Sequence, residues 1–161
     1  MKERLRYSKD LGDAAEEMFV CLLAFWYLYQ GREVNIRKST EREDKYDHID
    51  YFINNQSYDV KAKRHLETIW LEKTNILGYK GWLQGKADYI AFDILELNAF
   101  SVYRRHELFD FIKDIKEYTT DKSEHYKIYT RSKWGKKDEL IKVKYDDIKH
   151  LERLKLPYES D

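Results

Sequence analysis

The chain has 161 residues, enough for one domain with a buried core, and its 30 basic and 30 acidic side chains leave no net charge. A single cysteine excludes an internal disulfide and a cysteine-rich zinc cluster, and the five histidines show no metal-binding spacing such as HxxxH. The start has no apolar leader and the longest apolar run is too short to cross a bilayer, so we expect a cytoplasmic protein without a membrane partner.

The first predicted element is a helix over residues 9–29, in which apolar side chains recur at steps of three and four. On a helical wheel the apolar stripe centres near Met18 and Leu22. Glu16 falls at the margin of this stripe and Glu17 on the polar side. We expect Glu16 to reach inward, and Glu17 stays open as the alternative.

Strand patterns fill most of the remaining chain, with one glycine-rich loop at residues 78–87. The predicted strands cover residues 33–39, 46–53, 58–63, 68–77, 88–95, 99–105, 125–131 and 139–145. Amphipathic helices are expected at residues 106–118 and 146–156. The order of helix, mixed strands, helix, strands and helix predicts an α/β protein with a mixed sheet flanked by helices.

Residues 46–63 predict a tight hairpin whose turn is formed by Asn54 and Asn55, since asparagine tolerates a positive φ. This turn places Ile49 opposite Val60. Because successive strand residues point to opposite faces, one face of the hairpin is expected to be apolar throughout.

The other face of the hairpin gathers Asp50, Asp59 and Lys61, and the alternation places Lys63 on this face as well. Like charges directly opposite one another destabilise a sheet, so the acids either lie in water or hold a cation between them. Two carboxylates and the main-chain carbonyl of Val60 are hard oxygen ligands of the kind that Mg²⁺ takes. The Lys61 ammonium beside them is suited to hold an attacking water or the charge of a phosphate. An ordinary solvated face is the alternative.

Three segments resemble the PD-(D/E)xK nuclease superfamily, whose core is a helix followed by a mixed sheet. The stretch GDAAEEMF is similar to its first helix, and YDVKAKR is similar to its second motif. HIDYFI is similar to the first motif, although His48 and Ile49 stand where a proline is usual. The resemblance covers roughly residues 10–115, and residues from 120 onward match nothing familiar.

The resemblance implies a site in which Glu16, Asp50 and Asp59 hold one or two Mg²⁺ ions, with Mn²⁺ as a substitute. Lys61 would orient or activate the water. The expected activity is hydrolysis of DNA phosphodiester bonds by an endonuclease of phage, mobile-element, restriction or junction-resolving type.

The resemblance also implies one nuclease domain over residues 1–161. A restriction-endonuclease-like core would occupy about residues 9–118, followed by C-terminal strands and a helix at 119–158. A homodimer, RNA as the substrate and exonuclease action stay open at this point.

Cationic and aromatic side chains beyond the motif are expected to bind the DNA. They are Lys63, Arg64, Lys80, Trp82 and Lys86. For Trp82, core packing beneath the glycine loop is the competing interpretation. A second basic stretch at residues 127–144 contains seven cations and two acids. We expect it to open onto Asp59, with a solvated face as the alternative.

Two functions from different classes therefore remain. One is the nuclease, and the other is a non-catalytic nucleic-acid-binding or interaction protein that retains the fold. The intact set of two hairpin acids and a lysine favours the nuclease, because a member that had lost catalysis is expected to lose at least one of them.

Overall fold

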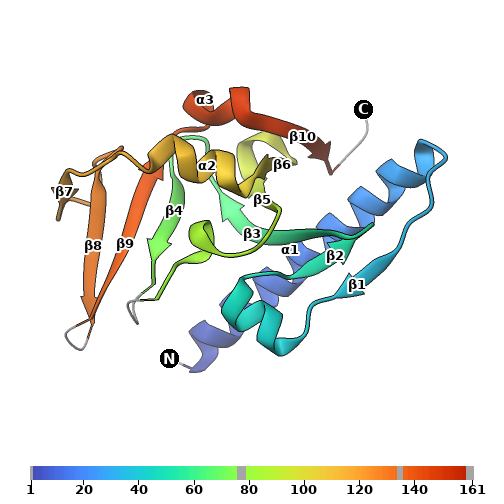
Figure 1. The fold of residues 1–161 in the computed structure, drawn as a ribbon, viewed down its shortest axis with the longest axis horizontal. Coiled ribbons are helices and arrows are strands. Elements are labelled where there is room, and N and C mark those ends of the chain that lie inside the picture. Colours follow the sequence, from blue (N-terminus) through green and yellow to red (C-terminus); the bar gives the residue numbers. More distant parts are fainter. Residues whose placement is uncertain (1, 76–78, 134–135, 159–161) are drawn as a thin grey trace.

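The computed structural model of the chain describes residues 2–75, 79–133 and 136–158. Within these residues the strands form two sheets, ordered β1-β2-β3-β5-β6-β10 and β4-β9-β8-β7 (Figure 1). The first sheet contains β1 (Ile36–Lys38), β2 (Tyr51–Ile53), β3 (Gln56–Arg64), β5 (Tyr89–Ile94), β6 (Ala99–Arg104) and β10 (Glu152–Pro157). The second contains β4 (Ile69–Thr74), β7 (Tyr118–Thr119), β8 (Ile128–Lys133) and β9 (Lys136–Val143).

The helices complete this arrangement and confirm the predicted α/β class with a mixed sheet flanked by helices. They are α1 (Lys2–Tyr29), the π-helix η1 (Glu43–Asp47), the 3₁₀ helices η2 (Trp82–Gln84), η3 (Leu95–Leu97) and η4 (Lys149–Leu151), α2 (Arg105–Ile112) and α3 (Tyr145–Ile148). Of the helices described, none is long and apolar enough to span a membrane.

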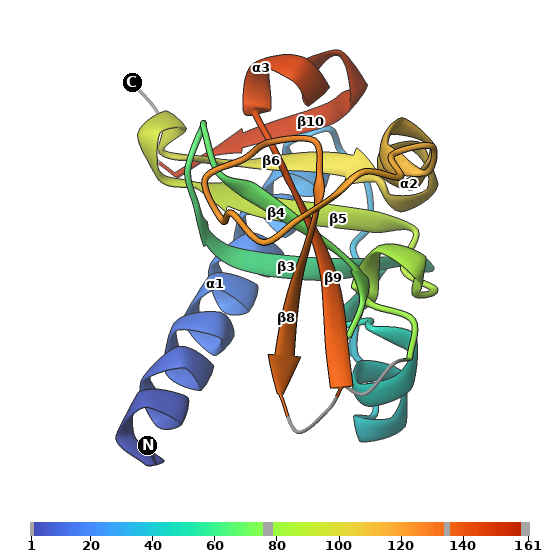
Figure 2. The same cartoon turned by 90° about the vertical axis from the view of Figure 1, so that its left-hand side faces the viewer.

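The chain passes repeatedly between the two sheets. It leaves the first sheet after β3 to form β4, returns for β5 and β6, leaves again for β7, β8 and β9, and returns for β10. Figure 2 shows the second sheet crossing in front of the first. Strand β3 pairs antiparallel with β2 and parallel with β5, so it lies in the interior of the first sheet.

Helix α1 buries a different face from the predicted one. Phe19 and Leu23 are fully buried, whereas Met18 is 47% exposed and Phe25 is 70% exposed. The wheel misplaced the stripe because residues 18–29 are apolar on nearly every side, so spacing alone does not select a face. Packing against the sheet selects it.

The face that α1 buries is fixed by aromatic contacts with two strands. The Phe19 ring lies 5.4 Å from the rings of both Tyr58 and Phe100, measured between centroids. Glu16, one turn before Phe19, therefore faces the sheet, while Glu17 is exposed. The helix ends where predicted, before Gly31, whose φ of +73° is a left-handed conformation that glycine favours.

The strand predicted at residues 46–53 is wrong in its first half. Residues 43–47 form η1, and β2 begins only at Tyr51. A reciprocal capping box starts η1: the Glu43 amide donates to the Thr40 hydroxyl at 3.2 Å, and the Thr40 amide donates to the Glu43 carboxylate at 2.9 Å. His48 ends η1 with a φ of 55°, a left-handed conformation that proline cannot adopt.

The hairpin turn is confirmed, but its register fails one step beyond β2. Asn54 and Asn55 have φ values of 50° and 65°, and Tyr51 pairs with Tyr58 as expected. The next residue, Asp50, donates its amide to the Tyr58 carbonyl at 2.8 Å, one position out of register. Because of this slip, the side chains before Asp50 point to the faces of the sheet opposite to the predicted ones.

The predicted apolar face of Ile49 and Val60 is therefore wrong. Ile49 packs in the cluster that contains Trp82, on the side of α2 and the second sheet. Val60 packs in the cluster against α1, on the other side of the first sheet. A one-residue slip moves a side chain to the opposite face, which explains the separation.

The later elements confirm most predicted strands and shorten two helices. Strand β4 covers part of the stretch predicted at 68–77, of which residues 76 and 77 lie outside the described residues. The helix predicted at 106–118 ends at Ile112, and Tyr118 pairs in β7. The terminal helix predicted at 146–156 ends within η4, because the final leucines alternate with exposed charges and complete the first sheet as β10.

One glycine brings η2 close to β4. A Cβ atom on Gly81 would lie 2.5 Å from the backbone oxygen of Glu72, so only glycine permits this approach. The guanidinium of Arg105 secures the following residues by donating to the carbonyls of Ala87 at 2.8 Å and Leu83 at 3.0 Å. Together these contacts hold Trp82 beside β3.

Candidate active site

Asp50 lies at the edge where β2 and β3 separate. The slip in register leaves the Val60 amide without its expected backbone partner on β2, and that amide donates instead to Oδ2 of Asp50 at 2.7 Å. An ionised carboxylate is a strong acceptor for a backbone amide. The bond holds the Asp50 carboxylate beside β3, within reach of both faces of the sheet.

Acids from two other elements approach Asp50. Burial, followed by contact with the Asp50 carboxylate and by the charges of Asp50, Asp13 and Asp44, raises the pKa of Glu16 on α1 to about 8. Burial and the neighbouring Asp50 also raise the pKa of Asp44 on η1. The predicted approach of Glu16 to Asp50 is confirmed, and Glu17 lies outside the group.

Asp59 is the most buried member of the group. Only 3% of this residue is exposed, and burial raises the pKa of its carboxyl to about 7, against the lowering effect of Lys61 and with a contribution from Asp50. The Lys61 ammonium lies 3.1 Å from Oδ1 of Asp59. The structure thus brings Asp50, Asp59 and Lys61 together, as the hairpin predicted.

The donor chemistry of this group fits a divalent cation. Oδ2 of Asp59 is buried and has no hydrogen-bond partner among the described residues. An unsatisfied buried carboxylate oxygen is costly, and carboxylates are the ligands that Mg²⁺ prefers. Asp50 lies beside each of Glu16, Asp44 and Asp59 separately. Within the described chain, no three acid, histidine or cysteine side chains are close enough together to form a metal cluster.

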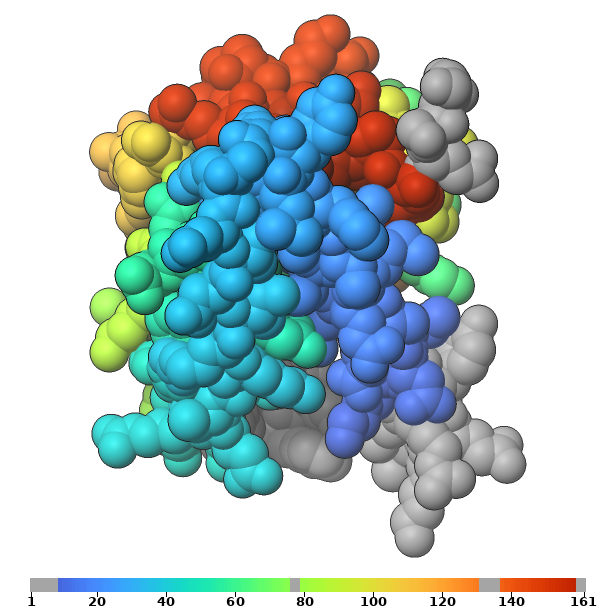
Figure 3. All heavy atoms as spheres, turned by 90° about the vertical axis from the view of Figure 1, so that its right-hand side faces the viewer, coloured from blue at the N-terminus to red at the C-terminus, as the bar shows by residue number. Residues whose placement is uncertain are grey.

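A cavity of about 310 Å³ opens on the α1 side of the acids. Glu16, Asp44 and Asp50 line it together with Asp13, Glu41, Ser39, Thr40, Lys9 and Lys38. Figure 3 shows the surface on this side of the molecule, where α1 and the segment of residues 30–50 lie side by side. The cavity therefore gives solvent access to Glu16, Asp44 and Asp50, and Asp59 is not among the residues that line it.

Lys61 is held on two sides. Besides Asp59, its ammonium lies 4.7 Å from the centre of the Trp82 ring, a cation–π contact. Trp82 is only 7% exposed and its ring meets that of Phe92 at 6.0 Å. The core interpretation of Trp82 is therefore confirmed, and one side of its ring supports Lys61. Its predicted role in stacking on DNA stays a prediction.

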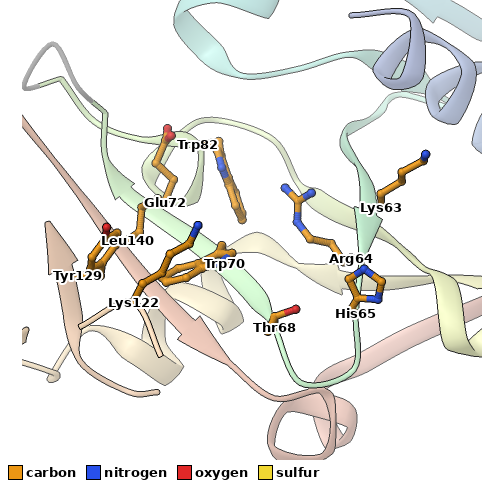
Figure 4. A pocket seen from close by; sticks show the side chains of 10 residues that line it. All are labelled: Lys63, Arg64, His65, Thr68, Trp70, Glu72, Trp82, Lys122, Tyr129 and Leu140. Atoms are coloured by element: carbon orange, nitrogen blue, oxygen red, sulfur yellow. The ribbon is translucent and has the colours of Figure 1, made fainter. Parts of the chain in front are cut away.

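The strand alternation predicted for Lys63 is wrong. A bulge between Lys61 and Arg64 interrupts the pairing of β3 with β5, and Lys63 adopts a φ of 47°. Figure 4 shows Lys63 pointing away from the other labelled side chains, while Arg64 points among them. The bulge gives Arg64 the inward position that alternation assigned to Lys63.

Lys80 and Lys86 lie apart from the acid group. Lys86 forms an ion pair with Asp47 of η1 at 3.5 Å, and Lys80 is exposed in a bridge with Thr74. Among the described residues neither lysine contacts Glu16 or the hairpin acids. Their predicted role in binding DNA stays a prediction.

The basic stretch at residues 127–144 does not form one open patch in its described part. Lys127 pairs with two glutamates at 2.9 and 3.3 Å, and Lys144 pairs with a third at 3.7 Å. Lys142 is buried and donates to a backbone carbonyl. The side chains of residues 131–136 lie outside the described part of the structure. Glutamates from elsewhere in the chain thus pair with Lys127 and Lys144, and this reduces the positive charge that suggested a polyanion-binding surface.

Asp44 is the acid that the sequence interpretation missed. The signal was present as the stretch TERE at residues 40–43, a capping box that predicts a helix start immediately before Asp44.

Comparison with known proteins adds no further guide to the site, because no protein-family model, curated protein or solved structure matches the chain.

Proposed function

We propose that the chain is a metal-dependent nuclease that hydrolyses phosphodiester bonds in DNA. The observation that carries this proposal is the position of Asp50 at the β2–β3 edge, beside Glu16 of α1 and also beside Asp59 of β3, with the Lys61 ammonium 3.1 Å from Asp59. The resemblance of the same residues to the PD-(D/E)xK motifs supports it.

Glu16, Asp50 and Asp59 are the residues that would hold the metal, with Asp44 beside them. A bound Mg²⁺ supplies polarisation of the phosphate and a hydroxide near neutral pH. The pKa values of Glu16, Asp44 and Asp59 are raised by burial and by the neighbouring acids, so a cation beside these carboxylates would relieve both costs.

Lys61 would act on the substrate. Its ammonium is fixed by Asp59 and by the Trp82 ring, so little conformational freedom remains to be lost when a phosphate arrives. In that position it can donate to the attacking water or to a non-bridging phosphate oxygen whose charge grows during the reaction. Trp82 excludes water from the opposite side of the ammonium.

The proposal is tested by a cleavage assay on supercoiled and single-stranded DNA with Mg²⁺, Mn²⁺ or EDTA. Glu16→Gln should remove most cleavage, whereas Glu17→Gln, the neighbouring exposed acid, should leave it unchanged. Equal loss in both variants would contradict the assignment of Glu16.

A wild-type protein that binds DNA but cleaves nothing with either metal would overturn the nuclease proposal. The non-catalytic binding function would then replace it. Metal binding measured by calorimetry separates the two further, because a binding module has no need for the acid group to take up an ion.

A further inference from the structure

A second cavity, of about 440 Å³, lies between the end of β3 and the second sheet (Figure 4). Its wall combines aromatic rings with basic side chains and includes Arg64, Trp70, Trp82, Lys122, Tyr129 and Glu72. A cavity of this size is within the range that holds small ligands in proteins, roughly 300–1,000 Å³.

Arg64 is the feature of this cavity that needs a partner. Its Nη1 donates to the carbonyl of Ala62, and its Nε is buried without a hydrogen-bond partner among the described residues. Burial lowers the pKa of Arg64, although Asp59 and Asp93 oppose that effect from the protein side. Arginine nonetheless stays charged in proteins, so the guanidinium presents a desolvated cation to the cavity.

The remaining charges in the lining favour an anion. Lys122 lines the cavity along with Arg64, Lys63 lies at its edge and points away from the other lining side chains, and Glu72 is the single acid in the described lining. His65 is paired with Glu96 at 2.8 Å outside the cavity. The buried Lys142 ammonium lies 5.5 Å from the centre of the Trp70 ring and adds positive charge behind the wall.

The aromatic walls suit a flat ring. Trp70 on β4 and Tyr129 on β8 lie 5.7 Å apart between ring centroids, inclined at 46°. Both side chains are partly exposed, unlike Trp82. Aromatic faces beside cations are the features with which proteins bind the bases and phosphates of single-stranded nucleic acid.

The cavity adjoins the acid group along β3. Trp82 forms part of its wall and carries the Lys61 ammonium on its ring. Arg64 is near enough to Asp59 for that carboxylate to affect the pKa of the guanidinium. A strand with one nucleotide in the cavity would therefore have its neighbouring phosphodiester beside Lys61.

We propose that this cavity receives one unpaired nucleotide of the substrate strand, with its phosphate on the Arg64 guanidinium and its base against Trp70 and Tyr129. Glu72 can accept a hydrogen bond from the base. This inference rests on the proposed nuclease function and narrows its substrate class to DNA with an unpaired or extruded nucleotide next to the cleaved bond.

The test is tryptophan fluorescence of the wild-type protein in EDTA, titrated with a short oligodeoxythymidylate, thymidine 5′-monophosphate, inorganic phosphate and a duplex of the same length. The oligonucleotide should quench the fluorescence and bind at least about tenfold more tightly than the duplex. Trp70→Phe should remove most of the quenching, and Trp26→Phe on α1 is the matched control that should retain it.

Variants of the cavity wall complete the test. Arg64→Ala should weaken oligonucleotide binding about tenfold or more, while Arg64→Lys should restore part of it. Tyr129→Ala and Lys122→Ala, on other elements, should weaken binding as well, and they decide the matter if Arg64→Ala does not fold. Unchanged affinity in these variants, or phosphate binding as tightly as the nucleotide, would overturn the proposal.

The two proposals fail in different ways. Oligonucleotide binding that depends on Arg64, together with no cleavage in Mg²⁺ or Mn²⁺, would leave the cavity assignment standing and remove the nuclease. Metal-dependent cleavage by a protein whose metal-free form shows no preference for unpaired DNA would retain the nuclease and remove the cavity assignment.

Discussion

The acid group and the aromatic cavity lie along the same strand and respond to burial with opposite sign. In the acid group, burial raises the pKa of Glu16, Asp44 and Asp59. In the cavity, burial lowers the pKa of Arg64. Both shifts have one physical cause, because a group taken out of water without a full partner disfavours its charged form.

The comparison teaches that a neutral net charge can conceal two charged sites that compensate each other. Thirty basic and thirty acidic side chains gave no indication of a polyanion or a cation partner. Within β3, however, Oδ2 of Asp59 and Nε of Arg64 carry opposite charges, and both are buried without a hydrogen-bond partner among the described residues. A nucleic acid bound together with a divalent ion would complete both.

The largest effect that distinguishes the two regions is expected from Asp59→Asn. Loss of a charged ligand should reduce Mg²⁺-dependent cleavage by about 10²-fold or more, while binding of unpaired DNA in EDTA persists. The metal-free protein should also melt at a higher temperature, because a buried charge is removed. Rates of plasmid nicking and thermal unfolding by circular dichroism check these outcomes, and a variant with wild-type cleavage would refute the role of Asp59.

A pH dependence of stability should follow from the acid group. The pKa of Asp59 rises from 3.8 in an ordinary carboxyl to about 7, and that of Glu16 from 4.5 to about 8. Between about pH 4 and pH 8 the unfolded chain releases these protons before the folded protein does, so the free energy of unfolding falls as pH rises.

This dependence is measured by melting temperatures of the metal-free protein at pH 5 and pH 8. The value at pH 8 should be lower, Mg²⁺ should raise it more at pH 8 than at pH 5, and Glu16→Gln should flatten the difference. The Glu43 carboxyl, whose pKa is lowered to about 2 chiefly by Arg37, acts with the opposite sign, and it does so mainly below about pH 5, where the unfolded chain takes up that proton. Melting that is independent of pH would contradict the burial of the acids.

Gly81→Ala should disturb both regions at once. Its Cβ would lie 2.5 Å from the Glu72 backbone oxygen, so η2 must shift and Trp82 must move from beneath Lys61 and from the cavity wall. We expect a loss of about 1–3 kcal/mol in the free energy of unfolding, with weaker cleavage and weaker nucleotide binding. Urea unfolding and both assays test this, and Gly12→Ala, at a site with open space, is the control.

The smallest expected effect is a difference in stability between two variants of Asp50, which separates its hydrogen bond to the Val60 amide from its proposed role in holding the metal. Asp50→Asn keeps an acceptor for the Val60 amide, whereas Asp50→Ala removes it. We expect Asp50→Ala to be less stable than Asp50→Asn by about 1 kcal/mol in urea unfolding, while both variants lose metal-dependent cleavage equally. Equal stability would show that the bond does not maintain the slipped register.

Sequence reasoning identified the two hairpin acids, the lysine and the turn, because each depends on local chemistry and strand parity, but it missed Asp44. It missed the slip at Asp50, since a single bulge leaves no trace in the alternation of side chains. The buried face of α1 depended on the contact of Phe19 with distant strands. The aromatic cavity was beyond prediction for the same reason, because Trp70 and Tyr129 meet only when β4 and β8 join the second sheet.

Because the chain passes repeatedly between the two sheets, shortening it to residues 9–118 would remove strands from both sheets. The partner of β4 is β9, and the outer partner of β6 is β10, and both follow residue 118. A fragment limited to residues 9–118 would carry every acid and the lysine of the site but leave two strand edges bare. Bare edges recruit other chains and aggregate. We therefore expect that a fragment from which the second sheet has been trimmed would aggregate.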